Sequence, residues 1–582
     1  MANSYLDFST AKLDYRELLT PPEGYVVDYA VGTTYSLDLQ ALLTVPLAFG
    51  FITDLGDDIE NINKLYTLSA IAETKKKFSI FCDAKNIKIP GKNQDSAFHK
   101  LLDDCVFTVN KEKASFHPKV WIISFKKIDS NKTEIIRVGI LSRNLTFDNS
   151  FDVAAFVDGS VSSVKNKNPV LCCFLKYLQK SCPLKNRHRE LIAKLAADVA
   201  KVKEFKCPTP FSNVKFHFFN KGEKYFTPKS LRENISGLAI VSPFLSSSVV
   251  KEAFALSERK DGGFKRLLIT RQSQYKAQMT GFMDEEVLGF CGDDDDSNRD
   301  VHAKIIFQER KKESNRLFLG SLNLTHNAFY ENTEFMAEFE FEKGKKYVSF
   351  EDFKELFSKK MFQNIKPIND SGEEKKENDI SFEEFFENIV EEKCSVLRNT
   401  GKVHLTFRKE LKNFEIKILG LNDGTFQGIV KDCYLRYNSI KDICEFFVLR
   451  DRNSKKEIVV KISLDKKPVK RDDELKNSLF ENSDDNMIEY LKMLLPGANA
   501  IKINGERKKG KTKGSGLKSI FEDGLYEKML KMMRNANRKE RFKEISDVLE
   551  KMDCCSGDSF GKVRKIVKAF TTVAEKYSKD CV

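Results

Sequence analysis

Two short stretches, FHPKVWII at residues 116–123 and VHAKIIF at residues 301–307, decide what kind of fold this chain adopts. Each carries a histidine and a lysine two positions apart and then continues as an apolar, β-rich run. Because residues i and i+2 of a strand lie on the same face, each histidine should project together with its lysine. The predicted pairs are His117 with Lys119 and His302 with Lys304.

The same further elements follow each pair in the same order. They are Asn144 in LSRNLT and then Asp152 in NSFDVA for the first copy, and Ser321 and Asn323 in GSLNLT and then Glu334 in NTEFMA for the second. The copies lie 185, 179 and 182 residues apart at the histidine, the asparagine and the carboxylate. This near-constant interval favours one duplicated site over a set of coincidences.

The surrounding sequence also repeats. Strand-like runs alternate with amphipathic segments over the first 165 residues, and a similar order recurs from about residue 210. This pattern predicts an α/β fold with two pseudo-symmetric halves that form one catalytic unit. A small mostly-β domain and a C-terminal α-helical region should follow them, because the apolar pattern changes first to alternation and then to helical stripes.

The predicted domain boundaries follow these changes in pattern. They are 1–165 for the first half, 166–209 for a linker helix, 210–345 for the second half, 346–400 for a helical connector, 401–470 for a β-rich accessory domain and 471–582 for a basic α-helical region. Residues 187–202 have the amphipathic pattern expected of the linker helix.

Composition limits the class of protein. The 582 residues carry 98 Lys and Arg against 85 Asp and Glu, a net charge of +13, which favours a polyanionic partner. The 13 cysteines have no CxxC spacing, which is typical of reduced thiols. The start, MANSYLDFST, lacks the features of a signal peptide, and the longest apolar run is shorter than the ~18 residues of a membrane span. We therefore expect a cytoplasmic protein that does not associate with membranes.

The duplicated residues suit the cleavage of a phosphodiester. Imidazole can act as nucleophile or as general acid and base near neutral pH. Lysine ammonium groups and asparagine amides can stabilise the charge on the phosphoryl oxygens, and a carboxylate can orient each imidazole. Since the lysines supply positive charge, no metal and no cofactor is predicted.

Both copies resemble the motif of the phospholipase D superfamily, which is HxK, then GSxN, then an acidic residue. The family usually has an Asp five residues after the Lys, where this chain has Ser124 and Glu309. The lack of that Asp is similar to the tyrosyl-DNA phosphodiesterase branch. The first copy also departs from GSxN, since Leu141 stands where the second copy has Gly320.

The resemblance implies a shared site between the halves and a phosphohistidine intermediate. It assigns the nucleophile to His117 and the acid and base role to His302. Other signals are weaker. The acidic run at residues 293–296 is interpreted as a solvated loop, and Trp121 as a core residue. The five remaining histidines are interpreted as structural or surface residues.

A basic, glycine-rich stretch near the C-terminus is a candidate nucleic-acid contact. Residues 502–518 carry a net charge of +6, which suits phosphate backbones without sequence preference, although a solvated loop is an equal alternative. The candidate contacts within it are Lys508, Lys509, Lys511 and Lys513.

The sequence therefore predicts a metal-independent phosphodiesterase acting on nucleic acid, most simply a nuclease, with DNA favoured over RNA as the partner. Bacterial defence or restriction is a setting suggested by analogy with the family. The alternatives are an end-processing enzyme similar to tyrosyl-DNA phosphodiesterase, a non-catalytic nucleic-acid-binding scaffold and a phospholipase. Protein partners of the C-terminal domains stay open.

Overall fold

The computed structural model describes most of the chain up to residue 479. The described ranges are 15–49, 64–89, 96–128, 130–147, 150–163, 167–221, 226–255, 264–282, 287–290, 300–342, 348–358, 362–368, 382–421 and 425–479. Within them the chain forms α-helices and mixed β-sheets, so the α/β prediction is confirmed. The basic stretch at 502–518 and the acidic run at 293–296 lie outside the described residues.

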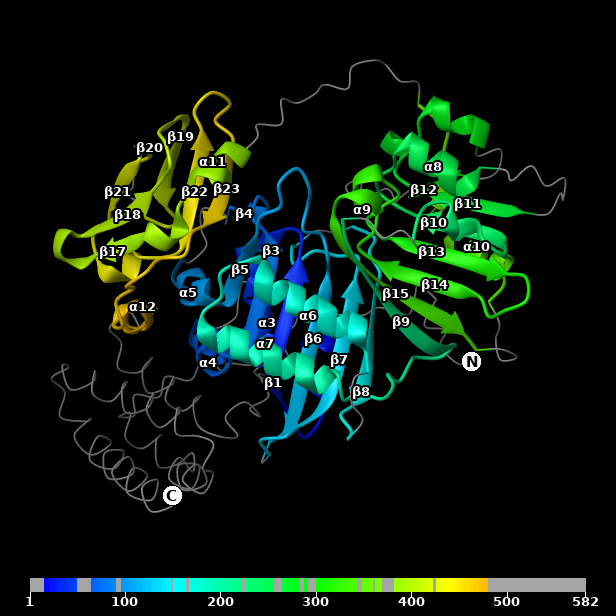
Figure 1. The fold of residues 1–582 in the computed structure, drawn as a ribbon, viewed down its shortest axis with the longest axis horizontal. Helices are drawn as coiled ribbons and strands as arrows, with labels where there is room; N and C mark the ends of the chain where they lie inside the picture. Colours follow the sequence, from blue (N-terminus) through cyan, green and yellow to red (C-terminus); the bar gives the residue numbers. More distant parts are fainter. Residues whose placement is uncertain are drawn as a thin grey trace, which may run out of the picture.

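The first sheet belongs to the N-terminal part of the chain (Figure 1). Its strand order is β5 (Val106–Val109), β3 (Phe78–Asp83), β1 (Tyr25–Thr34), β6 (Val120–Lys127), β7 (Thr133–Leu141) and β8 (Ala154–Ser160). Strands β1, β3 and β5 run parallel, and the remaining neighbours run antiparallel. Every residue of β3 is buried, as expected for a parallel strand covered on both faces.

The second sheet repeats this order and adds one strand at each edge. It runs β16 (Phe362–Asn364), β12 (Val287–Phe290), β11 (Lys265–Ile269), β10 (Ile235–Val241), β13 (Ile305–Arg310), β14 (Arg316–Gly320), β15 (Thr333–Phe341) and β9 (Phe211–Asn220). Strand directions also match, since β10, β11 and β12 are parallel and β13 to β15 follow antiparallel. In both sheets the HxK motif lies directly before the fourth strand of the repeated order.

Helices cover both faces of the sheets. The helices of the first half are α1 (Tyr15–Leu19), α2 (Leu39–Leu42), α3 (Thr44–Phe49), α4 (Lys64–Thr74) and α5 (Ser96–Leu101). The linking pair is α6 (Pro169–Ser181) and α7 (Asn186–Val199), which pack together on the other face of the first sheet (Figure 1). The second half carries α8 (Ser247–Phe254), α9 (His326–Tyr330) and α10 (Phe350–Ser358). One hydrophobic cluster runs from the linking pair into both sheets and so joins the halves.

Trp121 shows how tightly the first sheet packs. Its side chain is 1% exposed, as the sequence analysis expected of a core residue. In the sheet Trp121 lies opposite Gly32, where an added Cβ would lie 2.7 Å from the indole ring. The ring also packs edge-on against Phe49 of α3, with centroids 6.3 Å apart. The absence of a side chain at Gly32 therefore makes room for the indole directly beside the HxK strand.

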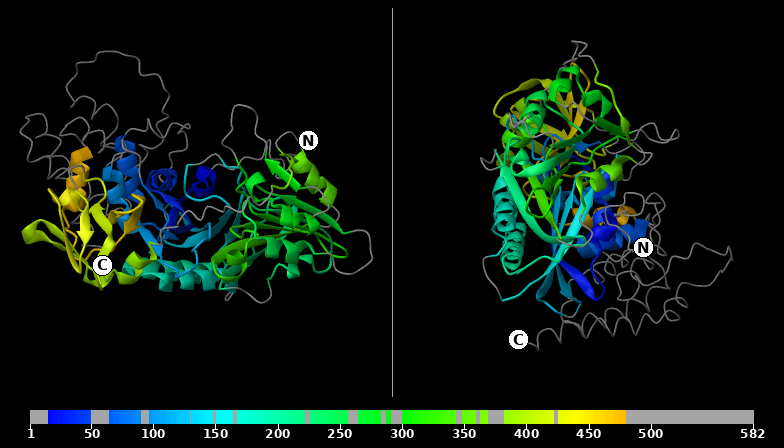
Figure 2. Two further views of the ribbon diagram at one scale, coloured as in Figure 1. Left: turned by 90° about the horizontal axis from the view of Figure 1, so that it is seen from above. Right: turned by 90° about the vertical axis from the view of Figure 1, so that its right-hand side faces the viewer.

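The C-terminal β unit packs against the first half. Its strands are β17 (Ser395–Leu397), β18 (Lys402–Thr406), β19 (Leu411–Ile418), β20 (Gln427–Ile429), β21 (Asp432–Arg436), β22 (Phe446–Asp451) and β23 (Glu457–Lys461), flanked by α11 (Glu383–Asn388) and α12 (Arg471–Leu479). Two short strands of the first half, β2 (Leu37–Asp38) and β4 (Ile87–Lys88), extend its larger sheet. Seen from above, the unit, the first half and the second half lie in a row (Figure 2).

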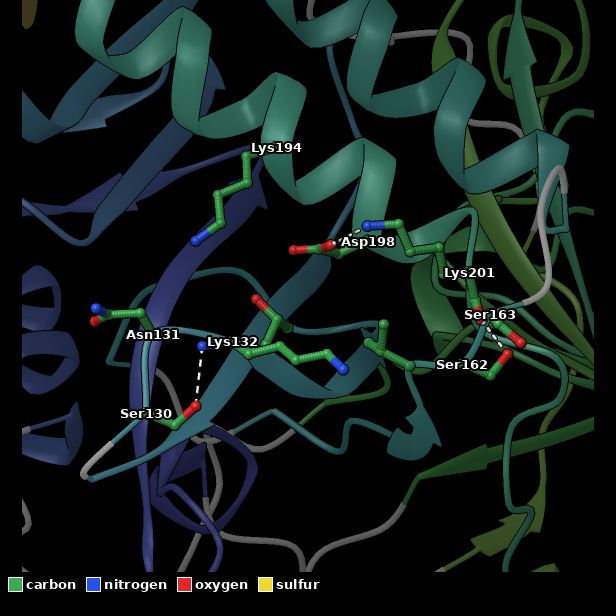
Figure 3. Close-up of a pocket in the computed structure, with 10 residues that line it drawn as sticks. Ser130, Asn131, Lys132, Ser162, Ser163, Lys194, Asp198 and Lys201 are labelled. Atoms are coloured by element: carbon green, nitrogen blue, oxygen red, sulfur yellow. Dashed lines mark hydrogen bonds and ion pairs between the residues drawn. The ribbon is translucent and has the colours of Figure 1, made fainter.

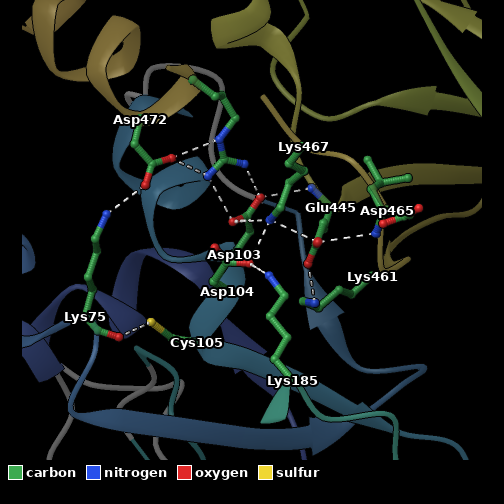
Figure 4. Close-up of polar contacts among 12 residues, drawn as sticks. Lys75, Asp103, Asp104, Cys105, Lys185, Glu445, Lys461, Asp465, Lys467 and Asp472 are labelled. Carbon is green, nitrogen blue, oxygen red and sulfur yellow. Dashed lines mark hydrogen bonds and ion pairs between the residues drawn. The ribbon is translucent and has the colours of Figure 1, made fainter. Parts of the chain in front are cut away.

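A buried ion-pair network holds this unit in place (Figure 4). Asp103 of the first half, 0% exposed, pairs with Arg471 at 2.6 Å and with Lys467 at 3.2 Å. Lys467 also contacts Glu445 at 2.9 Å, and Glu445 pairs with Lys461 at 2.7 Å. The charges satisfy one another, which is what allows them to be buried. The predicted domain boundaries stay predictions, but the accessory β unit shares a core with the first half.

Candidate active site

The two HxK motifs meet the opposite half of the chain. The backbone N–H of His117 donates to the carbonyl of Thr333, and the N–H of His302 donates to the carbonyl of Phe151, each at 2.9 Å. Thr333 and Phe151 are the residues directly before the two acidic candidates. Each histidine therefore lies next to the acidic segment of the other copy.

The side chains follow the same crosswise pattern. His117 Nδ1 lies 2.9 Å from Glu334 Oε2, and His302 Nδ1 lies 2.9 Å from Asp152 Oδ1. Glu334 is 0% exposed and Asp152 8%, so both carboxylates act in a desolvated setting. With Nδ1 held by the carboxylate, Nε2 of each imidazole is the nitrogen available for chemistry.

Two serines support the carboxylates. Ser142 Oγ donates to Asp152 Oδ1 at 2.6 Å, and Ser321 Oγ donates to Glu334 Oε2. Asn332 adds a further bond, from Nδ2 to Glu334 Oε1 at 3.2 Å. The sequence analysis counted Ser321, but not Ser142, among the candidate catalytic residues. The alignment of LSRN with GSLN contains the missing signal, because both serines occupy the same position of the motif.

Each of the two lysines bonds back to the backbone of its own motif histidine. Lys119 Nζ donates to the carbonyl of His117 at 2.9 Å, and Lys304 Nζ donates to that of His302. Their exposed fractions are 1% and 0%. The Tyr35 ring lies 5.0 Å from the His117 ring and 5.7 Å from Lys119 Nζ. Sequence analysis did not name Tyr35, because nothing local marks a residue after β1 as a neighbour of the motif.

The two asparagines differ in their partners. Asn144 Oδ1 accepts the backbone N–H of Ser36 at 3.4 Å, which ties it to the end of the first strand. In the described part of the chain, the buried Oδ1 of Asn323 has no hydrogen-bond partner, and the same is true of Asp152 Oδ2. Buried polar atoms are nearly always paired, so these two acceptor oxygens are open to a hydrogen-bond donor of a bound ligand or water.

Burial dominates the electrostatics of the site. It lowers the pKa of His117 to about 4, against the opposing effect of Glu334, and it lowers the pKa of His302 to about 4 together with the charge of Lys304. Burial also lowers the pKa of Lys119 to about 7, and that of Lys304 falls well below its usual value through burial and the charge of Lys119. Burial thus disfavours the cationic forms of these groups in the free site, and the negative charge of a bound phosphoryl group would stabilise them.

Glycine is required at the first position of the GSLN segment, where the LSRN segment has a leucine. Gly320 has φ +154°, and an added Cβ would lie 2.3 Å from the carbonyl oxygen of Phe335. Leu141, its counterpart at the end of β7, is 3% exposed and packs into the core shared with the C-terminal β unit. The departure from GSxN therefore changes the local packing, while Ser142 keeps its bond to the carboxylate.

The positions where the family motif has an Asp are occupied by structural residues. Ser124 Oγ donates to the carbonyl of Tyr29 at 3.0 Å. Glu309 accepts from Ser236 Oγ at 3.0 Å and from the N–H of Phe350 at 2.9 Å, which ties β13 to the start of α10. Neither residue contacts the histidines in any described interaction.

Other histidines have local partners of their own. His188 Nδ1 lies 2.8 Å from Ser79 Oγ, and His404 Nε2 lies 3.0 Å from Asp432 Oδ1. His217 Nε2 lies 2.8 Å from Glu338 Oε2, on the same strand as Glu334. These contacts fit the structural interpretation of these histidines. The four basic candidates Lys508, Lys509, Lys511 and Lys513 lie outside the described residues, so they stay a prediction.

A separate hollow lies on the first half near the C-terminal end of α7 (Figure 3). Serines, Asn131 and lysines line it, but none of the predicted catalytic residues does. Lys194 is paired with Asp28 at 2.5 Å and Lys201 with Asp198 at 3.0 Å, so two of its cations are partly neutralised. We assign this hollow no part in the chemistry.

The described ranges contain neither a candidate metal-ion cluster nor a membrane-spanning helix. Within them, no three His, Cys, Asp or Glu side chains are grouped so as to hold a metal ion. No helix among the described residues has the length and apolar character needed to span a bilayer.

No family model matches this chain, and no curated protein matches it. Among solved structures, yeast tyrosyl-DNA phosphodiesterase is similar over 57% of this chain and 87% of its own, at 11% identity and a TM-score of 0.36. Phosphatidylserine synthase from Haemophilus influenzae covers 60% of this chain and 84% of its own, at 10% identity and a TM-score of 0.34. NucT from Helicobacter pylori covers 22% of this chain and 86% of its own, at 21% identity and a TM-score of 0.17. All three belong to the phospholipase D superfamily, whose motif both copies in this chain resemble.

Proposed function

We propose that this protein is a phosphodiesterase of the phospholipase D type that cleaves nucleic acid without a metal ion. The observation that carries the proposal is the crosswise pairing of His117 with Glu334 and of His302 with Asp152, each at 2.9 Å. Two oriented imidazoles with two buried lysines are the groups needed to attack phosphorus, protonate a leaving oxygen and stabilise the phosphoryl charge.

In the proposed first step, His117 Nε2 attacks phosphorus and the bond from phosphorus to the leaving oxygen breaks. His302 Nε2 gives its proton to that oxygen, which leaves a phosphohistidine on His117. In the second step, His302 takes a proton from water as the water oxygen attacks phosphorus. The bond from phosphorus to His117 then breaks, and both imidazoles return to their starting states.

The electrostatics of the site support these roles. A pKa of about 4 leaves His117 neutral at physiological pH, which is the form that can attack. The acid, His302, must be protonated, and the negative charge of a bound phosphodiester raises its pKa. Lys119 and Lys304 would contact the phosphoryl oxygens, and the side-chain amide N–H of Asn323 would donate to them.

Nucleic acid is the substrate class that the charge of the whole chain favours. The net charge of +13 would attract a polyanion and raise its rate of association. End-processing at a phosphotyrosyl terminus, binding without turnover and phospholipid cleavage are the competing outcomes. Each of these outcomes gives a different result in the assays below.

The test uses purified full-length protein in excess EDTA. Substrates are single- and double-stranded DNA, RNA, a 3′-phosphotyrosyl oligonucleotide and phosphatidylcholine vesicles. Cleavage of internal bonds supports a nuclease, release of tyrosine alone supports end-processing, and lipid cleavage would refute the choice of nucleic acid. Binding without turnover in every assay would refute the proposal that the protein is an enzyme.

The mechanism is tested by trapping the intermediate. Quenching turnover on a 32P-labelled substrate with an alkaline denaturant should leave an alkali-stable, acid-labile phosphate on the wild type. The adduct should be absent from His117→Ala. In His302→Ala it should form slowly and then persist, because that variant lacks both the acid of the first step and the base of the second. An adduct that maps to His302 would reverse the two roles.

A further inference from the structure

The two pseudo-symmetric halves differ in charge at one matched position. Sheet register aligns Phe81 of β3 with Ile269 of β11, which places Asp83 in the first half where Arg271 stands in the second. Both side chains hydrogen-bond to the backbone of the residue before the motif histidine. Asp83 Oδ2 accepts the N–H of Phe116 at 2.9 Å, whereas Arg271 Nε donates to the carbonyl of Val301 at 2.8 Å.

Beside Arg271 lies an exposed aromatic ring. Phe244 is 39% exposed, and the Arg271 guanidinium lies over its ring at 4.8 Å from the centroid. Ser242 Oγ donates to the Phe244 carbonyl at 2.8 Å and accepts the N–H of Leu324 at 2.9 Å. Since Leu324 directly follows Asn323, Phe244 is linked by short contacts both to the His302 strand and to the asparagine of the second half.

We propose that Phe244 and Arg271 form a subsite for the unpaired nucleotide that flanks the scissile phosphodiester. The base would stack on Phe244, and the adjacent phosphate would contact Arg271. This inference rests on the proposed function and names its substrate class as single-stranded, or locally unpaired, nucleic acid. It also places this nucleotide on the side of the second half, because the matching position of the first half carries the buried carboxylate of Asp83 and not a cation.

The chemistry of the pair favours a nucleotide. A phenylalanine side chain gains by covering its exposed apolar face, and every base offers a π-face for stacking. Arginine is suited to phosphate because its planar donor groups match the oxygens. Asp300 lies 3.3 Å from Arg271 Nε but is 46% exposed, so this ion pair is weak and leaves the guanidinium attractive to a phosphate. A base inside a duplex cannot stack this way, which selects unpaired strands.

The test is a double-mutant cycle in which one change is made in the protein and the other in the substrate. Cleavage of a single-stranded oligonucleotide is compared with cleavage of matched strands in which the nucleotide on either side of the cleaved bond is abasic. Phe244→Ala should lower kcat/KM by about 10-fold on the intact strand, within the range reported for loss of one stacked base. On the strand that lacks the stacked base, Phe244→Ala and the wild type should have equal kcat/KM. On the intact strand, Phe244→Tyr should restore most of the loss.

The matched control is Tyr434→Ala, which removes an aromatic ring of similar exposure, 40%, from the C-terminal β unit. It should change neither strand's cleavage by more than about twofold. If Phe244→Ala loses the same factor on intact and abasic strands, or loses nothing, the subsite is refuted while the nuclease proposal stands. If the wild type neither cleaves nor binds any oligonucleotide, the proposed function fails and the subsite fails with it.

Discussion

Replacing Glu334 with glutamine tests the crosswise pairing directly. The change keeps the volume of the side chain but removes the negative charge that faces His117 Nδ1 at 2.9 Å. In the proposed first step the imidazole becomes cationic as Nε2 bonds to phosphorus. The carboxylate stabilises that cation in a setting with 0% solvent exposure, where a charge interaction is stronger than in water.

The expected loss follows from the burial of the pair. Breaking a buried, hydrogen-bonded charge pair costs about 3–5 kcal/mol, which corresponds to a fall in turnover of roughly 10²–10⁴-fold. The assay is kcat on the oligonucleotide that the wild type cleaves best, measured in EDTA. The phosphohistidine adduct should fall with it, because Glu334 acts on the step that forms the adduct.

The same strand supplies a matched control. Glu338 faces His217 Nε2 at 2.8 Å and is 5% exposed, so Glu338→Gln breaks a similar histidine–carboxylate pair away from the site. It should leave kcat within about twofold of the wild type, even if it lowers stability. Equal losses in both variants, or more than a tenth of wild-type turnover in Glu334→Gln, would show that the pairing is structural only.

Three further outcomes test other parts of the structure. The pKa of each predicted catalytic histidine is lowered to about 4, so the unfolded chain binds more protons than the folded chain between about pH 6.5 and 4. The free energy of unfolding should therefore fall as pH falls through this range, by up to about 3 kcal/mol per histidine. Urea melts that do not depend on pH would contradict this. Arg471→Ala leaves the buried carboxylate of Asp103 with Lys467 as its remaining ion-pair partner, and should destabilise the protein by about 1.5–3 kcal/mol in chemical denaturation; a loss below about 1 kcal/mol would show that the Arg471 pair is dispensable. Gly320→Ala places a Cβ 2.3 Å from the Phe335 carbonyl and should cost at least about 1–3 kcal/mol together with most of the turnover, whereas unchanged melting would show that the loop relaxes freely.

Much of the arrangement could be predicted from local pattern. The strands beginning at Val120 and Ile305 were expected because β-rich runs follow each HxK motif, and Trp121 was expected in the core. The linker helix was expected over residues 187–202, and α7 spans Asn186–Val199. These features depend on neighbours a few residues apart, which is the range over which periodicity and propensity act.

Other features could not be predicted because they depend on contacts across the chain. The short strands β2 and β4 of the first half extend the sheet of the C-terminal β unit, and no local pattern marks a two-residue strand as part of a distant sheet. Tyr35 reaches the His117 ring only because β1 lies beside β6. No local pattern marks the charged residues Asp103 and Arg471 as buried, since their burial depends on their meeting each other.

The amino-acid sequence by itself determined that this chain carries two sets of histidine, lysine, asparagine and acid on repeated α/β elements, since spacing along a strand is a local property. The tertiary structure alone decided that each acid holds the histidine of the opposite copy, and that Arg271 and Asp83 make the two halves unequal in charge. The physical reason is that two matching motifs can pair within or between copies, and only the packing of one sheet against the other selects between these two arrangements.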